Sequence, residues 1–361
     1  MERYTIKNKK LFKVNRYQQQ AIDKFSDTLN DKSYKKISNC IICNKKNFLL
    51  VSDIDRQGIK RPTTLCKECG YCFNNPQFTD ETHKNYYENF YREIDRDFKV
   101  PSKEFYELEK HRGADILNYL YLNGSLDKNS SCLDVGCGSG ATSFVFANVF
   151  KSTIGIDLAK EYTKNVEELD NLKILHTTIH DKFFDDKKFG FINYCHVFEH
   201  INDPMKDLER LKKIIKYDGY LYIEVPGIYH TDKWYDGNFF HSLEMDHTHF
   251  LTLTTLKNMM MKNDFELVHG DEIIRSIWKL KKDKNVFFIK NDFTNILKQI
   301  KKNDNFLRIN YITIKKNFEN LLIGLIKFLL KKIGLFNLIK KFYLKKNKKR
   351  VIYKNKKIYL D

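Results

Sequence analysis

The chain of 361 residues lacks an uninterrupted apolar run long enough to span a bilayer, for which a helix needs ~20 residues. It also has no recognisable secretory signal segment at its start. Two Cys-x-x-Cys pairs account for half of its eight cysteines, and this usage is typical of a reducing compartment. We therefore expect the protein to be cytoplasmic.

Strong positive charge is absent from most of the chain, although the formal net charge is +18. Residues 276–361 carry 24 Lys and Arg against 5 Asp and Glu, whereas the preceding residues carry 40 against 41. An enzyme that acts on a polynucleotide needs a basic body to draw it past the active site. The charge distribution therefore argues against a nucleic-acid partner.

The basic tail has a helical pattern of its own. Across residues 318–343, polar or glycine positions recur every three or four residues beside a broad apolar face. Such a helix can lie in a membrane surface, where apolar burial and lysine attraction to anionic lipid act together. It can equally cover the core of the protein or form a homodimer face. Both interpretations stay open, so we expect either peripheral contact with the inner face of the membrane or a buried helix.

The G-x-G-x-x-G spacing of dinucleotide-binding loops is also missing. In "SCLDVGCGSGATSFVFANVF", residues 131–150, the third glycine comes one residue early, at Gly136, Gly138 and Gly140. A short apolar run precedes these glycines and a helical pattern follows, which predicts strand, loop and helix. Backbone N–H groups at such a loop bind nucleotide-like ligands, so we expect a cofactor other than NAD. A tight turn without a ligand is the alternative.

A second apolar segment, "STIGIDLAKEY", ends in Asp157. A carboxylate at the end of this strand can accept hydrogen bonds from both hydroxyls of a ribose. We therefore predict that Asp157 holds the ribose of the cofactor. The alternative is an aspartate that caps the start of a following helix.

Strand and helix patterns alternate over residues 130–270, which favours a parallel sheet. Asp203 and Pro204 make a good start for a helix, and a later helix begins at Thr252 or Thr254. We expect an antiparallel edge hairpin near residues 266–274 and 285–290.

These motifs together resemble the class I S-adenosylmethionine-dependent methyltransferases. The resemblance rests on "LDVGCGSG" and on "FGFINYCHVFEHINDPMKDLERLKKIIKYDGYLYIEVPG", where Asp218 replaces one glycine of the usual turn. It implies a doubly wound, seven-stranded, Rossmann-like α/β sheet with S-adenosylmethionine as cofactor. The residues expected to contact that cofactor are Asp134, Gly136, Cys137, Gly138, Gly140, Asp157, Leu158 and Glu199.

The Cys-x-x-Cys pairs are separated by twenty-two residues, a spacing that fits one tetrahedral thiolate site. We predict a structural zinc ion, because four thiolates leave no open position for catalysis; four unrelated thiols are the alternative. The expected ligands are Cys40, Cys43, Cys66 and Cys69.

The segment with these cysteines, a predicted zinc ribbon, is followed by "GYCFNNPQFTDETHKNYYENFYRE". Together they resemble a subgroup of methyltransferases from sugar and surface-glycan biosynthesis. Its tyrosines, at Tyr86, Tyr87 and Tyr91, either cover the cofactor cleft or form a packed helical stripe.

Methyl transfer to a hydroxyl is helped by a general base, for which histidine is the usual residue near neutral pH. The candidates follow the predicted fourth and fifth strands: His247 is ranked first, then His200, and His249 completes the set. Each can instead be a structural hydrogen-bonding group. "HTH" can also be a metal pair, although the sequence shows no third ligand.

The favoured hypothesis is a methyltransferase that acts on an oxygen of a sugar, a nucleotide sugar or a nascent surface glycan. One alternative is a nucleic-acid methyltransferase, and another is a non-catalytic zinc-ribbon interaction protein on a methyltransferase scaffold. We expect five parts: an amino-terminal extension (1–36), a zinc ribbon (37–80), a helical cap (81–128), the methyltransferase domain (129–290) and a basic amphipathic helical tail (291–361).

Overall fold

The computed structural model describes residues 14–96, 101–231, 237–281 and 288–303. It also describes Tyr235, five single positions between 318 and 335, and the two strands of a hairpin, β14 (Val351–Lys354) and β15 (Lys357–Leu360). Most of the predicted amphipathic helix at 318–343 lies outside the described residues. Among the described residues, no helix is long and apolar enough to cross a membrane.

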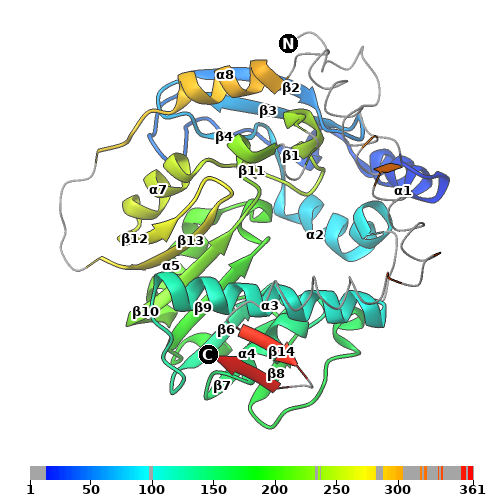
Figure 1. Cartoon of the computed structure of the whole chain (residues 1–361). Coiled ribbons are helices and arrows are strands. Elements are labelled where there is room, and N and C mark those ends of the chain that lie inside the picture. Colours follow the sequence, from blue (N-terminus) through cyan, green and yellow to red (C-terminus); the bar gives the residue numbers. More distant parts are fainter. Residues whose placement is uncertain are drawn as a thin grey trace.

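A seven-stranded mixed sheet forms the centre of the fold, with strand order β12-β13-β10-β9-β6-β7-β8 (Figure 1). Strands β8, β7, β6, β9 and β10 are parallel, and β13 pairs antiparallel with both β10 and β12. The chain order runs outward from β6 in both directions, so the carboxyl ends of β6 and β9 meet at a switch point, where α/β sheets bind ligands. The strands are β6 (Ser131–Val135), β7 (Ser152–Ile156), β8 (Leu172–Leu175), β9 (Phe189–Cys195), β10 (Ile215–Glu224), β12 (Phe265–Gly270) and β13 (Arg275–Leu280).

Helices cover both faces of this sheet because consecutive strand residues point to opposite sides. In β6, Cys132 packs with α3 (Lys103–Asn123) and α4 (Ala141–Ala147) on one face. Its neighbour Leu133 packs with α5 (Pro204–Ile214) and α7 (Leu253–Lys262) on the other. Buried apolar side chains on both faces give the continuous hydrophobic strands expected of a parallel sheet.

A four-stranded antiparallel sheet carries the cysteine pairs, in the order β11-β4-β3-β2. Three of its strands come from the amino-terminal region, but β11 comes from the segment that follows β10 along the chain. In Figure 1 this sheet and α8 (Phe293–Asn303) lie together, above the seven-stranded sheet. The strands are β2 (Phe48–Ile54), β3 (Lys60–Cys66), β4 (Cys72–Asn74) and β11 (His249–Phe250).

The remaining amino-terminal elements pack as one apolar group around Phe25 and Tyr86, both fully buried. Tyr86 therefore belongs to a helical core, which is one of the two roles predicted for the tyrosine stripe. The elements are α1 (Arg16–Thr28), α2 (Asp80–Asn89), a π-helical turn (Arg92–Arg96) and the paired short strands β1 (Tyr34–Lys35) and β5 (Gln77–Phe78).

Several predicted boundaries are confirmed. Asp203 caps α5 and Pro204 opens it, while Thr252 caps α7 through a capping box. The edge hairpin was placed wrongly in its second strand, which is Arg275–Leu280 and not 285–290. A short turn after β12 returns the chain at once, and Trp278 and Ile277 of β13 are fully buried against the neighbouring strands.

Candidate active site

The glycine loop after β6 adopts the left-handed backbone that its three glycines predict. Gly136, Gly138 and Gly140 have φ values of +65°, +55° and +75°. A Cβ atom at Gly136 would lie 2.3 Å from Val197 Cγ2, and one at Gly140 would lie 2.3 Å from Val166 Cγ2. At Gly138 the nearest neighbour of such an atom would be Tyr162 Cε1, at an ordinary contact distance of 3.8 Å. Two of the glycines therefore permit close packing, and the third has room for a small side chain beside Tyr162.

Asp134, at the end of β6, is held inside the sheet. Its carboxylate accepts hydrogen bonds from Ser143 Oγ at 2.6 Å and from Asn193 Nδ2 at 2.7 Å, and it is almost fully buried. Burial raises the pKa of Asp134 to about 6. These contacts tie the loop to α4 and β9, so Asp134 supports the loop from beneath. Its neighbour Cys137 is also buried, and burial raises the pKa of this thiol well above its ordinary value.

Asp157, at the end of β7, faces the same loop. Its Oδ2 accepts a hydrogen bond from Gly138 N at 3.0 Å, and its Oδ1 accepts one from Ala159 N at 2.8 Å. The second bond has the pattern of the predicted cap, but only a short 3₁₀ turn (Lys160–Thr163) follows. Burial raises the pKa of Asp157, and this carboxylate lies 3.9 Å from Arg92 Nη2.

An exposed apolar side chain and a cation flank Asp157. Leu158 is 63% exposed beside the loop, which is unusual for a leucine next to a buried strand end. The Arg92 guanidinium lies 3.7 Å from the centre of the Tyr162 ring. A carboxylate, an apolar surface and free backbone space are the contacts that a nucleoside requires. Asp157 and Leu158, both predicted from the sequence, therefore lie where they can contact the same ligand.

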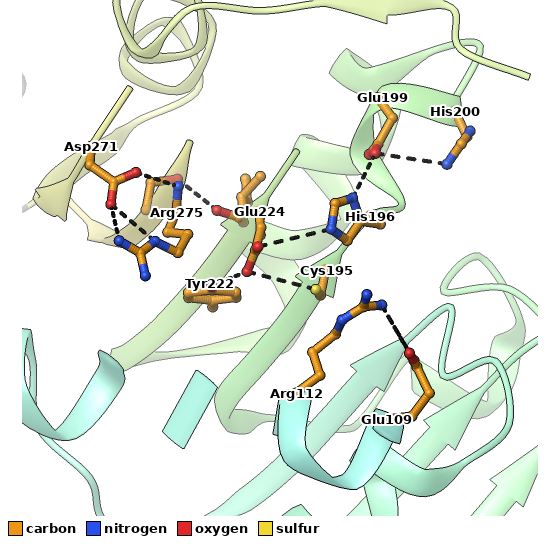
Figure 2. A network of polar contacts seen from close by, with 12 residues as sticks. Glu109, Arg112, Cys195, His196, Glu199, His200, Tyr222, Glu224, Asp271 and Arg275 are labelled. Atoms are coloured by element: carbon orange, nitrogen blue, oxygen red, sulfur yellow. Dashed lines mark hydrogen bonds and ion pairs between the residues drawn. The ribbon is translucent and has the colours of Figure 1, made fainter. Parts of the chain in front are cut away.

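A chain of polar groups runs across the carboxyl ends of β9 and β10 (Figure 2). His196 Nδ1 is 3.4 Å from Glu199 Oε1, and His196 Nε2 is 3.9 Å from Glu224 Oε1. The Tyr222 hydroxyl donates to Glu224 Oε2 at 2.5 Å, and Cys195 Sγ lies 3.9 Å from the same oxygen. Glu199, predicted as a cofactor contact, thus begins a network that crosses the sheet at its switch point.

Glu199 is 1% exposed in the 3₁₀ turn Phe198–His200. Burial alone would raise its pKa, but the positive charges of His200 and His196 outweigh burial and the pKa is lowered. Its Oε2 is buried without a hydrogen-bond partner. Buried polar atoms normally have a hydrogen-bond partner. Glu199 Oε2 is therefore available to accept a hydrogen bond from a ligand.

His200 and His247, the two leading candidates for the base, lie side by side with ring centres 4.9 Å apart. His200 Nδ1 is 3.2 Å from the Asp246 carbonyl oxygen and 3.4 Å from its Oδ2, and His200 Nε2 is 3.8 Å from Glu199 Oε1. Burial alone would lower the pKa of His200, but Asp246 and Glu199 outweigh it and the pKa is raised. His200 therefore lies between two carboxylates that favour its protonated form.

His249, the third candidate, has both ring nitrogens bound within the fold. Nδ1 lies 2.5 Å from the Tyr71 hydroxyl, and Nε2 lies 2.5 Å from the Ile201 carbonyl oxygen. Burial lowers the pKa of His249 to about 4. These contacts give His249 a structural role, with no ring nitrogen left for a substrate.

A small enclosed cavity of about 10 Å³, close to the volume of one water molecule, lies between these groups. Glu199, His247 and Tyr235 all line this cavity. The turn after β9 and the segment after β10 therefore meet around it. The full lining is Glu199, Pro226, Gly227, Ile228, Thr231, Tyr235, Ser242, His247, His249 and Phe250.

The four cysteines of the ribbon converge as predicted. Cys40 Sγ and Cys69 Sγ are 3.6 Å apart, and Cys43 Sγ and Cys66 Sγ are 3.5 Å apart. Tetrahedral zinc with Zn–S bonds of about 2.3 Å requires sulfur separations of about 3.8 Å. Hydrogen bonds among the thiols lower the pKa of Cys66 and raise the pKa values of Cys40 and Cys69. The cluster therefore fits a metal ion that would stabilise all four thiolates.

A second group of metal-ligand types lies at the cavity. Ligand atoms of Glu199, His200 and His247 are within 4.8 Å of one another. Only His247 of the "HTH" pair belongs to this group, because both ring nitrogens of His249 are engaged elsewhere. Since Glu199 and His200 already form an ion pair, the group is accounted for without a metal.

Sequence reasoning missed several residues of the site. Asp246 was available as a signal, because it directly precedes His247 in "EMDHTHF". Arg92 and Tyr235 had no comparable signal, since each lies in an irregular segment and reaches the site only through the folded chain.

Residues 106–270 match a family model described as a methyltransferase domain. The ubiquinone biosynthesis O-methyltransferase of Pelagibacter ubique is 26% identical over 185 residues, which cover 45% of this chain and 74% of that protein. The protein of the same name from Actinobacillus pleuropneumoniae is 32% identical over 100 residues, covering 25% of this chain and 43% of that protein.

Two solved structures are also similar. One is the plantazolicin methyltransferase BpumL in complex with a substrate analogue and SAH, with a TM-score of 0.42, 17% identity and coverage of 61% of this chain and 87% of that chain. The other is the complex of the Haloferax volcanii Trm112 methyltransferase activator with a putative methyltransferase, with a TM-score of 0.39, 14% identity and coverage of 52% and 100%.

Proposed function

This chain is a methyltransferase, and we propose that it transfers the methyl group of S-adenosylmethionine to a hydroxyl of a sugar, a nucleotide sugar or a nascent surface glycan. The observation that carries the proposal is the meeting of two features at one sheet edge. The glycine loop is uncrowded at Gly138 beside Asp157, and Glu199 and His247 line a small cavity. The methyltransferase match argues against the non-catalytic interaction protein.

The residues present fit S-adenosylmethionine. Asp157 would hold the ribose hydroxyls, Leu158 would contact the base, and the backbone at Gly138 would lie close to the ligand. The cofactor supplies an electrophilic methyl group when it is bound. Asp134 and Cys137 contribute indirectly, because their buried side chains fix the path of the loop.

His247 is our first choice for the general base. It lines the cavity with Glu199 and belongs to a second acidic group with Glu244 and Asp246. An acceptor hydroxyl would give its proton to an imidazole nitrogen of His247 as its oxygen forms the bond to the methyl carbon. The neighbouring carboxylates would stabilise the imidazolium that results. His200 is the second choice, because its ion pairs already favour the protonated form.

The lining of the cavity supports a polar acceptor. Thr231, Tyr235 and Ser242 line it beside Glu199 and His247, and a cavity of about 10 Å³ would admit one small polar group, such as a single hydroxyl of the acceptor. A second candidate acceptor is the hydroxyl of a small aromatic molecule. It is favoured by the two ubiquinone biosynthesis O-methyltransferases among the relatives.

The test has two steps. Calorimetry with S-adenosylhomocysteine should show binding at one site per chain, and no binding would contradict the cofactor assignment. A panel of nucleotide sugars and of small phenols is then assayed by the S-adenosylhomocysteine released. Turnover of sugars supports the proposal, turnover of phenols alone supports the second candidate, and methylation of RNA or DNA would revive the nucleic-acid alternative.

We also propose that Cys40, Cys43, Cys66 and Cys69 bind a structural zinc ion. The convergence of the four sulfur atoms, with separations near the tetrahedral value, supports it. The division into five domains, the cytoplasmic location, the homodimer and the membrane contact of the tail remain predictions.

A further inference from the structure

One side of the segment from Asp246 to Phe250 contacts the four-stranded sheet that carries the cysteine pairs, here called the cysteine ribbon. Strand β11 pairs with β4, so that His249 opposes Phe73 and Phe250 opposes Cys72. Asn74 N donates to the Thr248 carbonyl at 3.0 Å. Arg61 Nη2 of β3 contacts the Thr248 hydroxyl at 3.1 Å and the His247 carbonyl at 3.3 Å. The backbone from the His247 carbonyl to Phe250 is thus held by the ribbon sheet.

The other side of the same segment holds the turn that carries Glu199 and His200. Thr248 N donates to the Glu199 carbonyl at 2.8 Å, and His200 Nδ1 faces the Asp246 carbonyl. His249 Nε2 contacts the carbonyl of Ile201, directly after His200. Both candidate bases therefore depend on a short segment that lies between the ribbon and the end of β9.

Tyr71 and His249 form the direct link across this segment. A carbonyl only accepts hydrogen bonds, so His249 Nε2 must carry the proton that it donates to Ile201. In the neutral ring Nδ1 is then an acceptor, and the Tyr71 hydroxyl must donate to it. The lowered pKa of His249 agrees with this neutral tautomer. Tyr71 itself lies between Cys69 and Cys72, is fully buried and stacks on Phe73 at 4.8 Å.

We propose that Tyr71 and His249 are positioning residues, through which the cysteine ribbon sets the placement of His247, which lines the cavity, and of His200 beside it. The inference rests on the proposed function only in assigning these two histidines to the acceptor side of the site. The cofactor loop lies outside this chain of contacts: in the part of the chain that the structure describes, the Asp157 carboxylate accepts hydrogen bonds from Gly138 N and Ala159 N, neither of which belongs to the ribbon. The ribbon therefore shapes the acceptor side of the site and leaves the cofactor side unchanged.

The decisive variant is Tyr71→Phe, which removes one hydroxyl and keeps the ring. The full chain is labelled with ¹³C-histidine, and the imidazole signals of His200 and His247 are assigned from His200→Asn and His247→Asn. We expect Tyr71→Phe and His249→Leu to shift both signals, while the Kd for S-adenosylhomocysteine changes less than twofold. His249→Gln should restore the signals towards their original positions, because its amide can donate to one partner and accept from the other.

The matched control is Tyr34→Phe. Tyr34 also donates its hydroxyl to a carbonyl of the ribbon region, Lys60 O at 2.8 Å, but it lies outside the link to His249. Its loss should leave both histidine signals in place. If Tyr71→Phe behaves like Tyr34→Phe, the positioning role is overturned. Failure of the wild-type chain to bind S-adenosylhomocysteine would instead contradict the proposed function, whatever the histidine signals do.

Removal of metal gives an independent arm. Chelation of the wild-type protein should shift the same two signals, since Cys69, two residues before Tyr71, loses the ion that it shares with the other three cysteines. In His249→Leu, where the link is already cut, chelation should shift them little further. An equal shift in both proteins would show that the ribbon acts on the pocket by another route and would overturn the role of His249.

Discussion

The carboxylate of Asp157 and the backbone N–H of Gly138 are joined by a hydrogen bond of 3.0 Å between the end of β7 and the glycine loop. Asp157 therefore does two things at once: it fixes the loop and faces the space where a cofactor would bind. Its substitution must affect both properties, and the two effects can be measured separately.

Asp157→Ala should weaken binding of S-adenosylhomocysteine more than a hundredfold. Hydrogen bonds to a charged group contribute about 1.5–3 kcal/mol each, and a ribose offers two hydroxyls. The variant should also lose about 1–3 kcal/mol of folding stability, because the amides of Gly138 and Ala159 lose their acceptor. Calorimetry and denaturant unfolding measure these quantities. An affinity equal to wild type would refute the placement of the cofactor.

Gly138→Val should remove cofactor binding while the chain still folds, whereas Gly136→Val should disturb folding itself. A Cβ atom at 138 would make an ordinary contact with Tyr162 at 3.8 Å, but one at 136 would lie 2.3 Å from Val197 Cγ2. Both positions have positive φ, so both variants carry a similar backbone strain, and this makes them a matched pair. Far-ultraviolet circular dichroism and thermal unfolding separate the outcomes. Equal stability of the two variants would contradict the described packing of the loop.

His249 should make the protein sensitive to acid. Its pKa is lowered from about 6.5 in the unfolded chain to about 4 in the fold. A lowered histidine pKa gives a contribution that is present above pH 6.5 and is lost as the pH falls towards 4. The loss amounts to about 3 kcal/mol. His249→Gln cannot titrate, so its unfolding free energy should fall less between pH 6.5 and 4 than that of the wild type.

Zinc should be present at one ion per chain in protein purified without added metal. Cys66→Ser should lose it and destabilise the ribbon. The second knuckle contacts the start of α8, because Asn291 Nδ2 donates to the Lys67 carbonyl at 3.0 Å and Asp292 N to the Cys69 carbonyl at 3.3 Å. Limited proteolysis should therefore cut near both the ribbon and α8 in the variant. A metal-free preparation that resists proteolysis as the wild type does would count against a structural ion.

The sequence predicted those parts of the site that depend on local pattern. The positive-φ glycines, the caps of α5 and α7 and the four converging cysteines each follow from residues close together in the chain. Non-local contacts decided the rest. Asp134 was expected to face the cofactor, but Asn193 of β9 and Ser143 of α4 hold it inward.

His249 shows the same limit. Two histidines at alternating positions suggested a shared site, yet β11 begins only at His249, and its ring turns to Tyr71 of the ribbon. Nothing local to "DHTHF" reveals that this segment completes a sheet begun some 200 residues earlier. The misplaced edge strand has a similar origin, because pairing with β10 and not local composition determines where β13 lies.

The tail supplies the last prediction, and α8 determines how it must be tested. Ile296 and Ile300 of α8 are fully buried in an apolar cluster with Leu65 of the ribbon and Phe240. Burial of such side chains contributes about 1.5–3 kcal/mol each, so a chain cut at residue 290 should lose stability. A chain of residues 1–303 keeps α8 and removes the predicted helix at 318–343. It is therefore the right comparison with the full chain.

Full-length protein should sediment with anionic liposomes, and high salt should release it only in part. Each lysine near an anionic surface contributes about 1 kcal/mol that salt screens, whereas the apolar face contributes a term that salt does not remove. The 1–303 chain should stay in the supernatant and bind S-adenosylhomocysteine as tightly as the full chain. Such placement would suit an acceptor glycan assembled on a lipid at the inner leaflet. If full-length protein ignores the liposomes, or if the 1–303 chain unfolds, the helix covers the protein itself or a second subunit and the membrane interpretation is wrong.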